Sequence, residues 1–281
     1  MSAATPQQPV PLEAKSPFEL RVNMGRDVPE DVIRKALDTG DVGFLHSFTT
    51  GSAVDGPGVR VVAWTAGCHW RCRYCHNPDT WSLSNGIPVP LERAVEQLRR
   101  YRHGLKIMSG GFTLSGGEPL MQDRFAVRLF AAAHEMGIHT ALDTNGALGD
   151  RLSDDELETI DLVLLDIKSW DAERHRHLTG KDNGPVLDFA RRLSARRRPI
   201  SLRFVLVPGL TDDADDIAHI AGFCAGLGVV QRVDVLPFHQ MGRFKWKSLG
   251  LDYSLEDTEP PSTELVRRVV AQFQSAGLTA Y

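Results

Sequence analysis

The chain has 281 residues, 42% hydrophobic and 24% charged, which suits one globular domain, or one domain with an appendage. The formal net charge of −4 argues against a general binder of nucleic acid or anionic membranes, because such proteins rely on excess Lys and Arg. No apolar run approaches the ~20 residues that span a bilayer. The start of the chain also lacks the apolar core of a signal peptide, so the sequence favours a cytoplasmic protein.

The beginning of the chain differs from the rest. Residues 1–42 are rich in Pro and Gln near the start and contain no strand-like run, so we expect an N-terminal extension followed by one domain over 43–281. A short helix is predicted over 28–39, with Val32, Ile33 and Leu37 on one face. We expect the extension to be a mobile tail or a surface helix, and it carries no residue to which we assign chemistry.

From Val59 onward, apolar β-branched runs alternate with helical patterns. The predicted strands cover 59–66, 112–115, 138–144, 161–168, 200–208 and 230–238. Helices are predicted over 91–101, after a capping box formed by Ser153 and Glu156, over 182–197, over 212–227, and after Ser262 near the end. This alternation predicts a parallel sheet covered by helices, either as an open doubly wound sheet or as a partial barrel. In both architectures the active site lies at the carboxyl ends of the strands.

Three of the four cysteines, Cys68, Cys72 and Cys75, lie close together just after the first of these strands, in the spacing C-x3-C-x2-C. Three thiolates on one tight loop can bind three irons of a 4Fe–4S cluster, which leaves the fourth iron open for catalysis. A structural zinc site is the alternative, with His69 or His76 as the fourth ligand. Either kind of metal site could also belong to a binding module without enzymatic activity.

The C-x3-C-x2-C motif after a first strand resembles the signature of the radical S-adenosylmethionine (SAM) enzymes. This resemblance implies a partial (β/α)6 TIM-like barrel. It also implies a 4Fe–4S cluster on the three cysteines and SAM as a second cofactor. The fourth cysteine, Cys224, lies on the apolar face of the 212–227 helix, so we expect it in the core and expect no second cluster.

The span from Gly43 to Tyr281 resembles a narrower family, the pyruvate formate-lyase activating enzymes, which are glycyl-radical-enzyme activases. The segments that carry the resemblance include HSFTTGSAVDGPGVR, CHWRCRYCHNPDTW, SGGFTLSGGEP, LDTNG, LLDIK, VLVPGLTDD and LPFHQMGRFKW. The family generates a 5′-deoxyadenosyl radical from SAM and uses it to form a glycyl radical on pyruvate formate-lyase. A different glycyl-radical enzyme or a small molecule is the alternative substrate. The resemblance further implies flavodoxin or ferredoxin as the electron donor, and we expect a monomer.

The resemblance also implies the residues that contact SAM. Gly116, Gly117 and Glu118 would bind its amino group, although a plain strand-to-helix turn also explains this segment. Asp143 and Asp166 end two predicted strands and would help bind SAM, although helix capping also explains them. The other residues assigned to the cofactor site are Tyr74, His76, Ile167, Lys168, Arg203 and His239, with Lys168 also counted as catalytic. Tyr74 as a core aromatic and His239 as a structural histidine stay open as alternatives.

Three further expectations concern the surroundings of this site. In the closest relatives of the family the matching carboxylates hold a monovalent cation, Na⁺ or K⁺. Its ligands here would be the side chains of Asp143, Thr144 and Asp166 and the carbonyl of Leu164. Asp55 is implied to lie near the entrance for the substrate peptide. The basic run 191–199 is expected to be a solvated helix end, with partner docking as the alternative.

Overall fold

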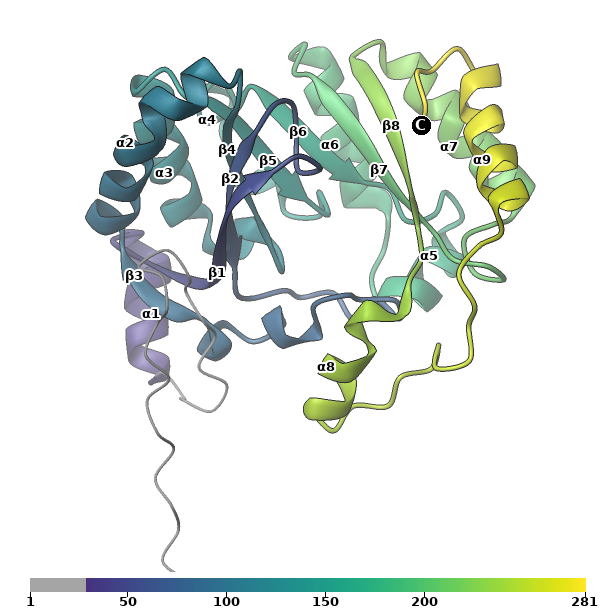
Figure 1. Ribbon diagram of the computed structural model, residues 1–281, viewed down its shortest axis with the longest axis horizontal. Helices are drawn as coiled ribbons and strands as arrows, with labels where there is room; N and C mark the ends of the chain where they lie inside the picture. The colour runs from purple at the N-terminus through teal and green to yellow at the C-terminus, as the bar shows by residue number, and fades with distance from the viewer. Residues whose placement is uncertain (1–28) are drawn as a thin grey trace, which may run out of the picture.

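The computed structural model describes residues 29–281, which form one eight-stranded sheet in the order β3-β1-β2-β4-β5-β6-β7-β8, with helices along its outer side (Figure 1). Six neighbouring strands run parallel: β2 (Arg60–Thr65), β4 (Gly111–Gly116), β5 (His139–Thr144), β6 (Leu162–Asp166), β7 (Ile200–Leu206) and β8 (Val230–Pro237). These are the six strands that the apolar runs predict. The open, curved sheet has the form of a partial barrel, as the family resemblance implies.

Two antiparallel strands extend the sheet and were not predicted. They are β1 (Val42–Ser52), which pairs with β2, and β3 (Ile87–Pro90), which pairs with β1 at the edge. The outer half of β1 is exposed and consists of Thr, Gly and Ser, so it lacks an apolar run. In β3, prolines occupy two of four positions, which a sheet tolerates only at an edge. Neither sequence therefore carries an ordinary strand signal.

Helices follow most of the parallel strands. The α-helices after the first are α2 (Leu91–Ile107), α3 (Asp123–Glu135), α4 (Asp154–Leu157), α5 (Ala172–Thr179), α6 (Gly184–Ala195), α7 (Ala214–Leu227), α8 (Arg243–Ser248) and α9 (Thr263–Ser275). Short 3₁₀ turns are η1 (Pro78–Thr80), η2 (Leu83–Asn85), η3 (Pro119–Gln122), η4 (Gly149–Arg151) and η5 (Gln240–Gly242). The predicted capping box of Ser153 and Glu156 is present, and Ser262 caps α9. Within residues 29–281 no helix is both long and apolar enough to cross a bilayer.

The main core lies between the sheet and the helices. Its large side chains include Trp70 and several phenylalanines, among them Phe112, Phe130, Phe204 and Phe273, all fully buried. Cys224 of α7 is 1% exposed and packs within this core, as its place on the apolar helix face predicts. The parallel strands are therefore buried on their outer face, and their carboxyl ends are left to form a site.

The predicted helix at 28–39 is observed as α1 (Glu30–Thr39). Ala36 is its buried residue and packs with Phe44 and Ala66, whereas Val32 is 43% exposed. The buried face is thus centred on a smaller residue than the sequence pattern suggests. The expectation of a mobile tail over residues 1–28 lies outside the described residues, and the domain boundary at 42/43 stays a prediction.

Candidate active site

A cavity of about 340 Å³ lies at the carboxyl ends of the parallel strands. It is bounded by the ends of β4, β5, β6 and β8, by the middle of β7, and by the loop after β2. Twelve of the residues assigned to a site from the sequence line it: Cys68, Cys72, Tyr74, Cys75, His76, Gly116, Gly117, Asp143, Asp166, Lys168, Arg203 and His239. Residues up to 171 positions apart are therefore brought together where the strand-end rule expects them.

The cysteine loop, residues 67–81, carries three unpaired thiols that line the cavity: Cys68, Cys72 and Cys75. Burial raises the pKa of Cys68 to about 12, and it raises the pKa of the other two thiols as well. Buried thiols with raised pKa values keep their protons until a metal replaces them. Loading this loop with metal should therefore release protons.

The three thiols fit an iron–sulfur cluster better than a single zinc ion. Within residues 29–281, no three His, Cys, Asp or Glu side chains converge closely enough to bind one ion. The cysteine ligands of a 4Fe–4S cluster bind different irons, so they stand farther apart than the ligands of one tetrahedral ion. His76, one of the two candidates for a fourth zinc ligand, packs against the ring of His239, with ring centroids 4.9 Å apart.

The first half of the cysteine loop is hydrogen-bonded to the carboxyl end of α5. The backbone N–H of Arg71 donates to the Thr179 carbonyl at 2.9 Å, and that of Arg73 donates to the Leu178 carbonyl at 3.0 Å. The last carbonyls of a helix have no partner within the helix, so the loop supplies the donors that they need. The position of α5 therefore fixes the part of the loop around Cys72.

A second contact joins α5 to the same part of the loop. Trp70, which lies between Cys68 and Cys72, packs edge-to-face against His175 at 5.0 Å. Both rings are 1% exposed, and Trp70 lines the cavity. An apolar wall of this kind keeps water away from the thiols, which is the packing role expected of a large aromatic residue here.

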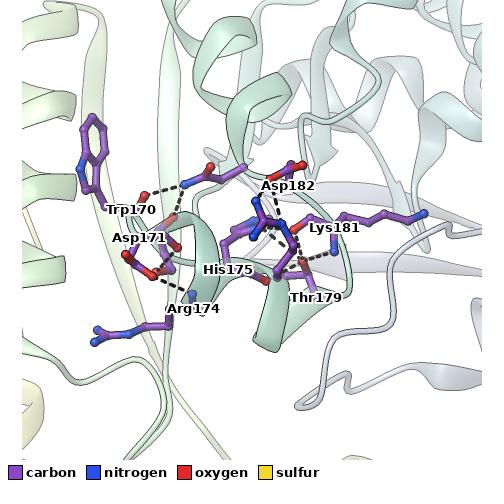
Figure 2. Close-up of polar contacts among 10 residues, drawn as sticks. Trp170, Asp171, Arg174, His175, Thr179, Lys181 and Asp182 are labelled. Atoms are coloured by element: carbon purple, nitrogen blue, oxygen red, sulfur yellow. Dashed lines mark hydrogen bonds and ion pairs between the residues drawn. The ribbon is translucent and has the colours of Figure 1, made fainter.

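The helix α5 is itself held by a polar network, and Figure 2 shows the part of it around His175 and Lys181. The buried Asp216 carboxylate accepts from the backbone N–H of Trp170 at 3.1 Å and of Asp171 at 2.8 Å. His175 donates from Nδ1 to the Lys181 carbonyl at 2.8 Å. Burial lowers the pKa of His175, which favours the neutral ring. The chain between β6 and α6 is thus fixed at both ends of α5.

Arg203 is the centre of one charged group in the cavity. Its Nη1 lies 2.9 Å from Asp143 Oδ2 and 3.4 Å from Asp55 Oδ1. Asp143 also accepts a hydrogen bond from Ser115 at 2.6 Å, and Asp166 pairs with Arg203 in the register of β6 and β7. The Asp143 carboxylate raises the pKa of the Arg203 guanidinium, which outweighs the opposing effect of burial. The apolar strand β7 can therefore hold a charged side chain.

Lys168 and Asp166 form the second charged group. Lys168 Nζ lies 3.0 Å from Asp166 Oδ2 and 5.5 Å from the centre of the Tyr74 ring. Burial favours the uncharged amine, but the neighbouring acidic groups, Asp166 foremost, together outweigh it and raise the pKa of Lys168. Two carboxylates, an ammonium and a guanidinium thus face one cavity. This mixture complements a zwitterionic ligand such as the amino-acid end of SAM.

The glycine segment after β4 allows close packing at the cavity wall. Gly116 has φ 128°, and a Cβ at this position would lie 2.2 Å from the backbone nitrogen of Thr65. A Cβ on Gly117 would lie 2.4 Å from the carbonyl oxygen of Gly67. Larger residues would push β4 away from β2 and the cysteine loop. The glycines therefore have a structural reason to be here, and their exposed backbone lines the cavity.

Glu118 is fully buried and does not line the cavity. Its carboxylate accepts from the backbone N–H of Leu120 at 3.0 Å and of Asn145 at 2.8 Å, and from the Thr144 hydroxyl at 2.8 Å. It thereby ties the end of β4 to the end of β5. Its predicted contact with SAM stays a prediction.

Replacing Glu118 should change how stability depends on pH. Burial raises its pKa to about 7 from 4.5, so the native state holds a proton that the unfolded chain has lost above about pH 4.5. The stabilising contribution is complete below about pH 4.5 and is lost as the pH rises through about 7. Urea unfolding of wild type and Glu118→Gln should give a free-energy difference that falls by about 3 kcal/mol between pH 4.5 and 8.

The exposed Glu92 of α2 gives the matched control for this measurement. The difference between wild type and Glu92→Gln should stay nearly constant over the same pH range. A constant difference for Glu118→Gln as well would contradict the raised pKa.

Four other predicted residues lie beside the cavity without lining it: Asp55, Thr144, Leu164 and Ile167. Asp55 is 5% exposed, and its carboxylate is bound by Arg203 and, at 2.6 Å, by the Ser52 hydroxyl. Its predicted contact with a peptide stays a prediction. Thr144 is 2% exposed, and its hydroxyl donates to Glu118.

The sequence did not single out several residues that belong to the site. Ser115 orients Asp143, and Asn145 both lines the cavity and donates its backbone N–H to Glu118. Both directly adjoin residues that were named, at strand ends, and this adjacency was the available signal. The basic run 191–199 lies away from the cavity, and its Arg192 and Arg196 pair with Asp154. This pairing supports a solvated helix end.

Comparisons with known proteins identify the family of the chain. A family model described as the radical SAM superfamily matches residues 62–221. Pyruvate formate-lyase-activating enzymes of Staphylococcus aureus strains are 44% identical over 232 residues, which is 80% of this chain and 92% of the relative. A domain of a pyruvate-formate lyase-activating enzyme from Bacteroides vulgatus has a TM-score of 0.52 and 27% identity, over 61% of this chain and 98% of that domain.

A radical SAM methyltransferase from Sphaerobacter thermophilus has a TM-score of 0.57 over 90% of this chain and 81% of its own, at 16% identity, which is a likeness of fold alone. Family membership implies a 4Fe–4S cluster and SAM as cofactors. The three cavity-facing thiols suit the cluster, and the paired charges beside them suit the amino-acid end of SAM. With the family model matching more than half of the chain, the protein belongs to the radical SAM superfamily and, within it, to the family of pyruvate formate-lyase-activating enzymes.

Proposed function

We propose that this protein activates pyruvate formate-lyase by forming a glycyl radical on it. The observation that carries the proposal is the meeting of three unpaired thiols with two carboxylates, a lysine and an arginine around one cavity at the strand ends. The likeness to the Staphylococcus aureus enzymes, whose name states this activity, supports the choice of substrate.

The residues of the cavity would have three roles: binding the cluster, binding the amino-acid end of SAM, and forming the wall around the rest of SAM. Cys68, Cys72 and Cys75 would hold the cluster. Asp143, Asp166, Lys168 and Arg203, with the backbone of Gly116 and Gly117, would bind the amino-acid end of SAM, while Tyr74, His76 and His239 would form the wall around the rest of it. When bound, the two cofactors supply a 5′-deoxyadenosyl radical that removes a hydrogen atom from a glycine. The protein's own part is to orient SAM, exclude water and admit the glycine loop.

A monovalent cation near SAM is part of the same proposal. Asp143 and Asp166 line the cavity and would supply carboxylate oxygens, joined by the Thr144 hydroxyl and the Leu164 carbonyl. Asp143 and Asp166 are already paired with Arg203 and Lys168, so a cation would have to compete with these side chains. Binding of SAM to the loaded protein in Na⁺, K⁺ and tetramethylammonium buffers tests the site. Equal affinity in all three would contradict it.

The electron donor, the assembly state and the compartment also belong to the proposal. We propose flavodoxin or ferredoxin as the donor, a monomeric protein and a cytoplasmic reaction. Reduction of the cluster by each purified donor, followed by electron paramagnetic resonance, tests the first point. Light scattering during gel filtration tests the second.

The decisive experiment is glycyl-radical formation. Protein reconstituted without oxygen, reduced and mixed with SAM and pyruvate formate-lyase should give a glycyl doublet in the electron paramagnetic resonance spectrum. The doublet should require every component. If 5′-deoxyadenosine accumulates without a doublet, the radical chemistry is right but the partner is a different glycyl-radical enzyme or another substrate. If an intact cluster gives neither product, the proposed function is wrong.

A further inference from the structure

The chain after β8 turns back across the strand ends toward the cysteine loop (Figure 1). We call residues 239–250, which include η5 and α8, the return segment. Three motifs that carry the family resemblance without contributing a cluster ligand meet here. They are HSFTTG on β1, HNPDTW at the end of the cysteine loop, and GRFKW in the return segment. Because these three motifs supply no ligand to the cluster, their contact with one another needs a different explanation.

The return segment contacts the loop at Cys75 itself. Trp246 donates from Nε1 to the Cys75 carbonyl at 2.9 Å, and its ring packs edge-to-face on Trp81 at 5.2 Å. A Cβ on Gly242 would lie 2.7 Å from the His76 carbonyl oxygen, so the two backbones touch. The segment therefore packs against the loop residues that line the cavity on this side.

A buried ion group adds a second attachment. The Asp79 side chain is 9% exposed and lies 3.0 Å from Lys245 Nζ and 2.8 Å from His46 Nε2. Lys245 also donates to the Asn77 side-chain oxygen at 2.8 Å. Burial alone would raise the pKa of Asp79, but His46 and Lys245 outweigh it and lower the pKa below its usual value. The carboxylate is thus held ionised between two partners from distant parts of the chain.

This group joins the two sides of the open barrel. His46 belongs to β1 on one side of the sheet, and Lys245 follows β8 at the other edge. The strands β1 and β8 do not pair with each other. Asp79, in the cysteine loop, pairs with His46 of β1 and with Lys245, which follows β8. The hydrogen bonds to α5 hold the loop at Arg71 and Arg73, and its last residues are bonded to its first, since the Gly67 and Cys68 N–H groups donate to the Thr80 and Trp81 carbonyls. Cys75 lies between these two attachments, where the return segment contacts the loop.

We propose that Lys245 is a positioning residue, which together with Trp246 fastens the Cys75 end of the cysteine loop to the return segment and, through Asp79, to β1. It touches neither a thiol nor the reacting atoms. Its effect is to fix where Cys75 and the adjoining cavity wall stand. The proposal concerns the site of the proposed function, but its main test follows the loop directly and does not depend on the identity of the substrate.

Lys245→Met removes the ammonium and keeps an apolar stem of similar length. In the loaded, anaerobic protein, amide hydrogen exchange should become at least about tenfold faster over residues 75–81, where the N–H groups of Cys75, Thr80 and Trp81 are hydrogen-bonded within the loop. The spectrum of the reduced cluster should also change in shape, and SAM should bind about tenfold more weakly. Lys245→Arg keeps a cation and should restore most of all three properties.

Lys247→Met is the matched control, because Lys247 lies on the same short helix and is exposed. It should leave exchange, spectrum and SAM affinity unchanged. If Lys245→Met behaves like Lys247→Met, the proposal is wrong. Faster exchange spread evenly over the chain, with no excess at 75–81, also overturns it, since that is the mark of a general loss of stability.

Trp246→Phe keeps the inference testable should Lys245→Met fail to fold. It retains an aromatic ring and removes the hydrogen bond to the Cys75 carbonyl. Exchange should rise over residues 75–81 and stay unchanged over α5, which holds the other half of the loop. Equal exchange in Trp246→Phe and wild type would count against the return segment as an anchor. A normal glycyl doublet together with a loosened loop would separate this inference from the proposed function.

Discussion

Cys72→Ala is expected to fold and to lose the cluster. Cys72 is the middle thiol of the three that line the cavity, and the fourth cysteine, Cys224, is buried in the core and cannot take its place. Two remaining cysteines cannot hold the cluster stably. Iron and sulfide bound after anaerobic reconstitution should fall to near background. Cleavage of SAM to 5′-deoxyadenosine should fall by at least about 1,000-fold.

Cys224→Ala is the control for this prediction. Cys224 is buried in the core on α7 and lies outside the cavity. The substitution should cost about 1 kcal/mol in unfolding free energy through lost packing, while iron content and cleavage rate stay near wild type. Wild-type cleavage in Cys72→Ala would show that the cluster is not bound as assigned. Loss of iron in Cys224→Ala would show that the iron assay follows general stability.

Arg203→Met should produce the next largest effect. Its guanidinium lies between Asp143 and Asp55, both largely buried, so the variant leaves two carboxylates without their cation. Breaking a buried pair by removing one partner costs about 3–5 kcal/mol in unfolding free energy. Because Arg203 also lines the cavity, SAM affinity should fall by about tenfold or more. Urea unfolding and equilibrium binding of SAM to loaded protein measure the two effects.

Arg232→Met provides the comparison for Arg203. Arg232 lies on the neighbouring strand β8 and pairs with Asp234, but its side chain is 51% exposed. Exposed pairs contribute about 0–1 kcal/mol, so stability and SAM affinity should barely change. If both variants lose the same small amount of stability and bind SAM equally well, Arg203 does not organise the charges of the cavity.

The strands show which elements of the fold a local sequence pattern can predict. The six parallel strands could be predicted because each is an apolar, β-branched run buried on the helix side, and a run of this kind is visible in any short window. The strands β1 and β3 could not be predicted, because the exposed Thr- and Gly-rich outer half of β1 and the Pro-interrupted edge strand β3 form strands only when a neighbour supplies hydrogen bonds. The helix α1 shows the same limit, since Ala36 is buried only because Phe44 and Ala66, from other parts of the chain, pack against it.

The site divides in a similar way. The sequence by itself determined the cysteine spacing, the polar residues that end buried strands, and the alternation of strands with helices that carries them to one edge of a parallel sheet, because these depend on residues near one another in the chain. Only the tertiary structure decided that Arg203 joins Asp55 to Asp143, that Glu118 turns into the core, and that α5 holds the first half of the cysteine loop. The same holds for Asp79 and Lys245, which are 166 residues apart. Such contacts depend on how the whole sheet curves, and no local pattern of residues encodes that curvature.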